Sequence, residues 1–317
     1  MKKKIVSGMV IGSVALLAAM GLAFLWWCPH LESAIRAMGP HWAFKRQMVW
    51  NVIGVAVCCG VAALGWKRLL KVAPLVFAGW IAMYFVAANF MPAVNGSLCL
   101  RFGPFVIHVL SCIPFVFALI FAWVAERFKF RAVPLLLCTS AMLVVATTVS
   151  IASTPGRVER IKTFLSGGTP DKAEPSSGAL ARIYCQRQQS AAFKTARWFG
   201  SGDAEALKFV PGRCTHSMPV ASAVVFGKWF PAVVLALFAV FAAGLVLSWR
   251  SAPSESQKVF VFVGGLGIVM PAAQCFGECF NLVPMHFIDV PLVSFGGTQV
   301  LTAWLTAGTL LSRKPVE

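Results

Sequence analysis

The sequence predicts an all-α membrane protein, a polytopic helical bundle of about eight transmembrane helices with one large extracytoplasmic loop. Two observations lead to this fold class. Hydrophobic residues make up 58% of the 317 residues and charged residues only 12%, whereas about a quarter of a soluble domain is charged. The missing charges leave long uncharged runs, each near the ~20 residues that a helix needs to cross the hydrocarbon core of a bilayer.

Eight uncharged runs reach this length. In chain order they are Ile5–Trp27, Met48–Gly65, Val72–Met91, Phe105–Ala125, Ala132–Ala152, Trp229–Trp249, Val259–Val283 and Ser294–Leu311. The first run is longer than the core of a signal peptide and no small-x-small cleavage site follows it, so we expect a retained span. The short run Met48–Gly65 also fits a buried core helix, but its neighbours are of spanning length. We therefore expect a single domain over residues 1–317.

Basic residues in the short connections set the expected orientation. They fall on one side of the predicted bundle, at Lys2–Lys4, Lys67, Arg68, Lys71, Arg127–Arg131, Arg250, Lys258, Arg313 and Lys314. The positive-inside rule makes this side cytoplasmic, and an even number of spans places both termini there. The net charge of +17 would suggest nucleic acid as a partner of a soluble protein. Here the basic residues flank spans, so we expect membrane lipids and no nucleic acid.

The opposite side carries the large loop, roughly residues 153–217. Its part from Gly167 to Gly178 is rich in Gly, Pro and Ser and is expected to be irregular. The part from Ala179 to Phe199 combines apolar and basic residues and is expected to form a surface helix at the membrane interface. A disulfide between Cys185 and Cys214 is one alternative in an oxidising compartment, although no spacing rule supports it.

Ionisable residues inside a span are costly and mark functional sites. Glu278 lies in the seventh run, with Gln274 four residues before it on the same helix face and Asn281 three residues after it. A polar contact between helices explains this group equally well. Beyond it, the segment Pro284–Thr298 holds prolines and paired glycines, which predicts a re-entrant bend that is buried or lines a watery cavity.

The same segment resembles the C-terminal signature of the SEDS family, which includes RodA, FtsW and SpoVE. Pro284, Pro291 and the run Ser294-Phe-Gly-Gly-Thr298 keep the order and spacing of that signature, although Phe287 replaces a glycine. Weaker family landmarks recur in order along most of the chain. They are Phe44–Gln47, Asn95–Ser97, Arg101–Phe105, Arg157–Leu165, Tyr184–Ser190, Gly200–Gly202 and Val210–Thr215.

The chain also departs from the family pattern. An aspartate proposed as essential for catalysis in the family falls on His216, and a family glutamate falls near Ser111 in the segment His108-Val-Leu-Ser. A family segment and its neighbouring helices are missing before Arg157, which accounts for eight expected spans where the family has ten. The removal of two helices keeps the sidedness of everything downstream.

The resemblance implies peptidoglycan glycosyltransfer, in which lipid II is polymerised at the outer face of the bacterial inner membrane for cell division or elongation. It also implies a class B penicillin-binding protein as partner. Arginine and lysine side chains suit the pyrophosphate of lipid II, although Lys45 could equally snorkel to the interface. The expected substrate-binding residues are Lys45, Arg46, Arg101, Ser294, Gly296, Gly297 and Thr298.

Glycosyl transfer needs a base that takes a proton from the attacking hydroxyl. His216 is one candidate because imidazole titrates near neutral pH. Glu278 and Asp289 are substitute carboxylates on the expected outer side, as are Asp203 and Glu205. If none acts, the chain is an inactive scaffold that binds a penicillin-binding protein or lipid II. A lipid transporter is a weaker alternative, since no inverted repeat is visible. No cofactor or metal-ligand cluster is evident, although a divalent cation could bridge a pyrophosphate.

Overall fold

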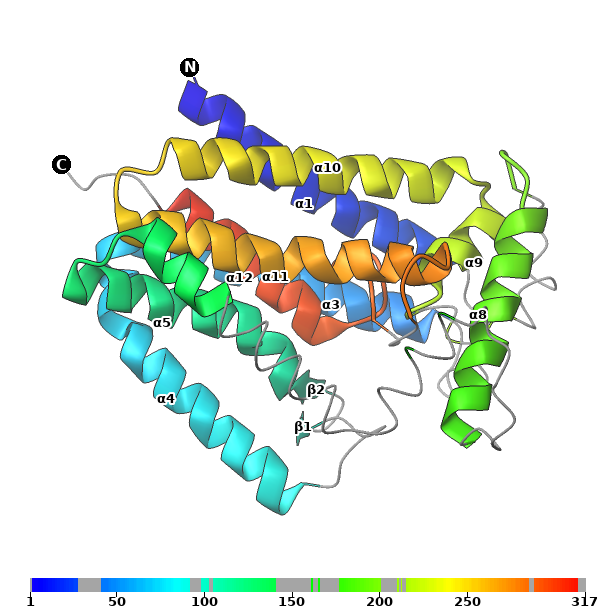
Figure 1. Cartoon of the computed structure of the whole chain (residues 1–317), viewed down its shortest axis with the longest axis horizontal. Helices are drawn as coiled ribbons and strands as arrows, with labels where there is room; N and C mark the ends of the chain where they lie inside the picture. The colour runs from blue at the N-terminus through cyan, green and yellow to red at the C-terminus, as the bar shows by residue number, and fades with distance from the viewer. Residues whose placement is uncertain are drawn as a thin grey trace. The chain divides into compact units, whose positions relative to one another are not determined.

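The computed structural model describes residues 2–27, 41–91, 98–102, 105–140, 161, 165, 177–200, 210, 212, 215–284 and 288–312, and Figure 1 shows their elements. The first half contains α1 (Lys2–Trp27), α3 (Trp42–Leu64), α4 (Trp66–Phe90), β1 (Cys99–Phe102), β2 (Phe105–His108), the 3-10 helix η1 (Val109–Cys112) and α5 (Ile113–Phe128). The second half contains α8 (Ser177–Thr195), α9 (Met218–Val225), α10 (Trp229–Arg250), α11 (Glu255–Cys279) and α12 (Gly297–Leu311).

Six helices in the described part of the chain are long and apolar enough to cross a membrane, which confirms the predicted class of helical membrane protein. They are α1, α3, α4, the segment Val109–Phe128 that includes α5, α10 and α11. The fifth predicted run begins as a helix over residues 132–140 and then leaves the described residues. The eighth run is α12, which has 15 residues. The count of eight spans therefore stays a prediction.

The chain forms two compact units. The first comprises Met1–Ala132, Val234–Pro271 and Pro291–Glu317, and the second comprises Val133–Val233 and Ala272–Val290. This division does not test the prediction of a single domain, which stays a prediction. Each unit is described by itself.

In the first unit, α12 packs closely along α3 because small residues leave room at the contact. A Cβ on Gly54 would lie 2.3 Å from Cδ1 of Trp304, and a Cβ on Gly308 would lie 2.5 Å from the backbone oxygen of Cys58. Small residues of this kind let membrane helices approach each other closely, so that dispersion contacts can replace the hydrophobic effect that lipid removes.

The same contact between α3 and α12 contains buried hydrogen bonds. The side chain of Asn51 donates from Nδ2 to the backbone oxygen of Gln47 at 2.9 Å and accepts at Oδ1 from Nε1 of Trp304 at 3.0 Å. Asn51 and Gln47 are both buried. Because lipid offers no replacement partner, the bond from Trp304 to Asn51 fixes the register of the two helices, while the bond to Gln47 within α3 orients the Asn51 amide.

A short antiparallel hairpin precedes α5. Cys99 pairs with His108, Leu100 with Ile107, and Arg101 with Val106. The prediction of one helical span over Phe105–Ala125 is therefore wrong at its start, since residues 105–108 form strand β2 and the α-helix begins at Ile113. The indole Nε1 of Trp80 on α4 donates to the backbone oxygen of Val109 at 3.0 Å and holds the hairpin against α4.

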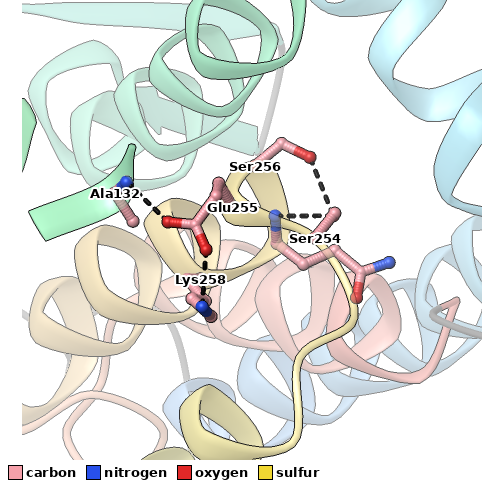
Figure 2. Close-up of polar contacts among 6 residues, drawn as sticks. Ala132, Ser254, Glu255, Ser256 and Lys258 are labelled. Atoms are coloured by element: carbon pink, nitrogen blue, oxygen red, sulfur yellow. Dashed lines mark hydrogen bonds and ion pairs between the residues drawn. The ribbon is translucent and has the colours of Figure 1, made fainter. Parts of the chain in front are cut away.

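Polar contacts join the beginning of α11 to the end of α5 and the helix that follows, as Figure 2 shows in part. The carboxylate of Glu255 accepts from the backbone N–H of Ala132 at 2.8 Å, which caps the helix over residues 132–140. Oγ of Ser254 accepts from the backbone N–H of Gln257 at 3.3 Å and caps α11. Ser256 donates to Glu126 at 2.7 Å. The bonds from the N–H groups of Ala132 and Gln257 satisfy helix-start donors that would otherwise lack partners, whereas the bond from Ser256 to Glu126 connects α11 with α5.

In the second unit, α8 covers most of the helix expected over Ala179–Phe199 but ends at Thr195. Its Gln189 donates to Oγ of Ser217, at the start of α9. Its Phe193 ring contacts the Phe280 ring edge-on, with the centroids 5.0 Å apart. The predicted surface helix is therefore partly buried on one side, and these contacts connect it with both α9 and the segment after α11.

Candidate functional site

A non-helical segment over residues 288–296 leads into α12, as expected for the bend predicted in Pro284–Thr298. Its residues Val290–Ser294 are buried. The amide of Gln47 on α3 clamps it from both sides: Nε2 donates to the backbone oxygen of Ser294 at 3.1 Å, and Oε1 accepts from the backbone N–H of Gly296 at 3.2 Å. One buried side chain therefore fixes the backbone on both sides of Phe295.

This clamp positions Phe295 against Arg46. The guanidinium carbon of Arg46 lies 5.1 Å from the centroid of the Trp42 ring and 5.7 Å from that of the Phe295 ring. Such cation–π contacts hold an arginine while leaving its N–H groups available as donors. Lys45 differs, because its side chain is exposed, which agrees better with an interfacial position than with a place in this site.

The hairpin adds further groups near Arg46. Cys99 and Arg101 alternate with Leu100 on β1, and their partners on β2 are His108 and Val106, so these four side chains share one face of the hairpin. Electrostatic interactions connect Arg46 with Arg101 and with His108. The structure thus brings together two of the three predicted pyrophosphate ligands.

His108 was missed by the sequence reasoning, which treated its segment only as a degenerate family motif. Its backbone N–H donates to Oγ1 of Thr298 at 3.0 Å, and its Nδ1 lies 3.2 Å from Sγ of Cys99. Burial, and next to it the positive charge of Arg46, lower the pKa of His108. The alternation of residues on either side of Gly103-Pro104 was the signal that could have indicated a strand pair.

The remaining predicted substrate ligands hold the loop in place. Ser294 and Thr298 are buried, and the hydroxyl of Thr298 joins the first turn of α12 to strand β2. Gly297 lies under Trp50, where a Cβ would be 2.1 Å from the indole Nε1. Gly296 has more room, since a Cβ there would lie 3.6 Å from the nearest side-chain atom, Oε1 of Gln299. Direct contact of these residues with a substrate stays a prediction.

His216 lies in a tight turn of the second unit. The carbonyl of Gly212 accepts from the backbone N–H of Thr215 at 3.1 Å and of Ser217 at 2.9 Å. Gly212 has a φ of 62°, and a Cβ there would lie 2.0 Å from Cε1 of His216. Glycine is therefore required under the imidazole ring. Burial lowers the pKa of His216 to about 4, so the ring is neutral at neutral pH.

The other two base candidates gather with His216 around the end of α11. Sγ of Cys275 donates to the backbone oxygen of His216 at 3.2 Å. Electrostatic interactions connect the same cysteine with Glu278 and Asp289. Glu278 is buried and accepts from Nε2 of Gln274 at 3.4 Å, whereas Asp289 is half-buried. All three predicted bases thus lie in one region of the second unit.

Asn281 does not extend the polar helix face as the sequence suggested. It has a φ of 59°, and the backbone N–H of Leu282 donates to the oxygen of Gly277 at 2.8 Å. This is the left-handed termination that ends many helices. Asn281 therefore ends α11 and its side chain is exposed.

Several predicted features lie outside the described residues, so they stay predictions. They are Asp203, Glu205, Asn95–Ser97, Arg157, Arg160, Phe287 and the Cys214 end of the suggested disulfide. Within the part of the chain that the structure describes, no group of three or more His, Cys, Asp or Glu side chains is arranged to hold a metal ion. A divalent cation that bridges a pyrophosphate stays a prediction as well.

Comparisons with known proteins give a match in structure only. No family model matches the sequence, and no curated protein matches it. A chain from a peptidoglycan synthase complex that coordinates polymerization and crosslinking aligns with a TM-score of 0.68 and 17% identity over 95% of both chains. The rod shape determining protein RodA of Thermus thermophilus aligns with a TM-score of 0.62 and 16% identity, covering 96% of this chain and 95% of RodA.

An aspartate-to-alanine variant of the same RodA aligns with a TM-score of 0.64 and 16% identity over 96% of both chains. The alignments extend over nearly the whole length of each protein, and the absence of two helices stays a prediction. The likeness bears out the resemblance that the C-terminal motif suggested, at the level of the fold. This chain has the fold of the SEDS protein RodA.

Proposed function

We propose that this chain is a SEDS-type peptidoglycan glycosyltransferase that polymerises lipid II at the outer face of the bacterial inner membrane, with a class B penicillin-binding protein as partner. The observation that carries the proposal is the arrangement around Arg46. In a chain with the RodA fold, the signature loop is clamped by Gln47 and presents Phe295 to the Arg46 guanidinium.

Arg46 and Arg101 provide positive charge for the pyrophosphate leaving group of this reaction. A sugar hydroxyl attacks the anomeric carbon of a second lipid II, the bond to the pyrophosphate breaks, and undecaprenyl pyrophosphate leaves. Arg46 and Arg101, which interact electrostatically, would hold the pyrophosphate through charge-assisted hydrogen bonds. Positive charge placed there before the reaction stabilises the negative charge that develops on the leaving group.

The proton from the attacking hydroxyl needs a base, and the candidates are Asp289, His216 and Glu278. Asp289 is half-buried, whereas Glu278 is buried in α11, so Asp289 is easier for a substrate to reach. His216 is neutral at pH 7 and able to accept a proton, but its pKa of about 4 makes it a weak base. We therefore rank Asp289 first, His216 second and Glu278 third.

The geometry of His216 also supports a second candidate function, a scaffold without catalysis. Its ring is fixed over Gly212, and burial lowers its pKa to about 4. A chain that has lost its base would still bind lipid II through Arg46 or hold a penicillin-binding protein. The peptidoglycan synthase complex with a similar chain, which couples polymerization to crosslinking, gives a precedent for such an assembly.

Polymerisation in nanodiscs distinguishes the two functions. The purified chain receives fluorescent lipid II, with and without a class B penicillin-binding protein, and glycan strands are separated on a gel. An enzyme produces strands, and Asp289→Asn lowers the rate by about 10²–10⁴-fold, the usual contribution of a general base. Arg46→Gln lowers it as well, while the matched control Arg68→Gln, at an exposed arginine of α4, leaves it unchanged.

Other outcomes are equally informative. If Asp289→Asn is active and His216→Ala is not, the base is His216, and Glu278→Gln completes the series. If no variant or partner gives strands but the chain forms a stable complex with the penicillin-binding protein, the scaffold is correct. Labelling of single cysteines placed at either end of the chain tests the proposed orientation, since both termini should react only from the cytoplasmic side.

A further inference from the structure

The hairpin face beside Arg46 carries a histidine that no part of the proposed mechanism uses. His108 and Arg101 lie on the same face of the two strands. The backbone N–H of His108 binds Thr298 in the first turn of α12, so the strand that bears the imidazole is fixed to the helix that follows the signature loop. Helix α12 begins at Gly297, and the free N–H groups of a helix start favour anions.

The groups that contact His108 or act on its charge come from four elements. Arg46 on α3 places a positive charge near it, and Cys99 on β1 contacts its Nδ1 at 3.2 Å. Sγ of Cys112 on η1 lies 4.0 Å from the backbone oxygen of His108. Helix α12 contributes the Thr298 hydroxyl and no titratable side chain over Gly297–Leu311. Within the described residues, the charges that act on His108 are thus positive, and no carboxylate is among these groups.

We propose that His108 is the proton-binding member of a pyrophosphate site that it forms with Arg46, Arg101 and the first turn of α12. The site takes the pyrophosphate of a polyprenyl-linked ligand, and in this the inference rests on the proposed function. With the site empty, burial and the charge of Arg46 keep the imidazole neutral. A bound pyrophosphate neutralises the arginines and adds negative charge beside the ring, which favours the charged imidazolium.

The consequence is that ligand binding takes up a proton at His108. Because binding and protonation are linked, the affinity for the pyrophosphate must rise as the pH falls, by up to about tenfold per pH unit where a full proton is taken up. Cys99 contacts Nδ1 of the ring, and both ring nitrogens carry an N–H in the imidazolium, so Nε2 is the nitrogen that can donate to the anion. By the same linkage, His108 loses this proton when the pyrophosphate product leaves.

Calorimetry of farnesyl pyrophosphate binding to the full chain in nanodiscs tests this directly, without any turnover. Titrations between pH 6 and 8 in buffers of different ionisation enthalpy give the number of protons taken up per ligand. Farnesol, which lacks the anion, and inorganic pyrophosphate, which lacks the lipid, separate the two parts of the ligand. We expect uptake with farnesyl pyrophosphate and inorganic pyrophosphate, and none with farnesol.

The variants decide which residue takes the proton. His108→Gln should lose the uptake that exceeds the titration of the ligand itself, and the control His41→Gln, at a histidine stacked on Trp26 with centroids 4.3 Å apart, should keep it. His108→Lys, which is charged at every pH used, should bind without that pH dependence. Thermal unfolding shows which variants are folded. One folded variant of His108, either His108→Gln or His108→Lys, is sufficient for the test.

Equal proton uptake by wild type and a folded His108 variant would overturn the inference. So would unchanged affinity in Arg46→Gln, because it would place the anion elsewhere. These results do not depend on polymerase activity: a scaffold that binds the lipid-linked pyrophosphate would still take up the proton, and an active enzyme without this linkage would still make glycan.

Discussion

Replacing Gln47 by leucine removes the clamp on the signature loop while keeping the approximate volume of the side chain. The substitution removes two hydrogen bonds, one to the carbonyl of Ser294 and one from the N–H of Gly296. A typical intramolecular hydrogen bond contributes roughly 0.5–1.5 kcal/mol, so the free energy of unfolding should fall by about 1–3 kcal/mol. At roughly 2–4 °C per kcal/mol, even the low end lowers the Tm by about 2 °C.

Thermal unfolding of the nanodisc-embedded protein measures this shift, and binding of farnesyl pyrophosphate measures its functional side. Phe295 loses its position in the variant, so Arg46 loses one of the two rings that hold it and the affinity should fall. Gln299→Leu is the matched control, because Gln299 is a half-buried glutamine in the first turn of α12. A Tm for Gln47→Leu equal to that of Gln299→Leu would refute the assignment of the clamp.

Two further predictions concern the second unit and the contact between α3 and α12. Burial holds the pKa of His216 at about 4, below the usual histidine value of 6.5, so between those pH values the unfolded chain binds the extra proton and stability is lost as the pH falls. The Tm of the wild type should therefore drop more steeply from pH 6.5 to 4 than that of His216→Gln, and parallel curves would contradict this. Gly297→Val places a Cβ 2.1 Å from the Trp50 indole and should cost about 1–3 kcal/mol, whereas Gly296→Ala, with its nearest side-chain atom at 3.6 Å, should be tolerated; equal Tm values for the two would show that the α3 contact is looser than described.

Hydropathy was sufficient to predict the membrane class and most helices, because spanning length and absence of charge are local properties. It placed Lys45 and Arg46 before the second span, whereas α3 begins at Trp42 and contains both. The reason is that the hydrophobic window starts only after the last charge.

The hairpin could not be found in the same way. Residues from Phe105 onward form one uncharged apolar run, and a short apolar strand cannot be told from the start of a helix by composition. The pairing of β1 and β2 was needed to place His108 and Arg101 on one face. Missing the hairpin therefore also meant missing the histidine of the candidate pyrophosphate site.

The part of the candidate site that lies in a sequence motif could be predicted, whereas the part formed by residues distant in the sequence could not. The Ser294–Thr298 motif correctly indicated a bend before the last helix. The residue that holds that bend, Gln47, is 247 positions away from Ser294 in the sequence. Its glutamine looks like any polar residue at the start of a span, and only the fold reveals its two partners.

That separation sets the order in which the protein can be completed during synthesis. Helix α3 enters the membrane early, with the amides of Gln47 and Asn51 on the face that later receives α12. Until the ribosome has delivered the residues after Ser294, those amides face lipid or a transient partner. The proposed pyrophosphate site is thus complete only once the last helix has been made, and a chain that stops before Ser294 leaves the amides of Gln47 and Asn51 without Gly296 and Trp304 as partners.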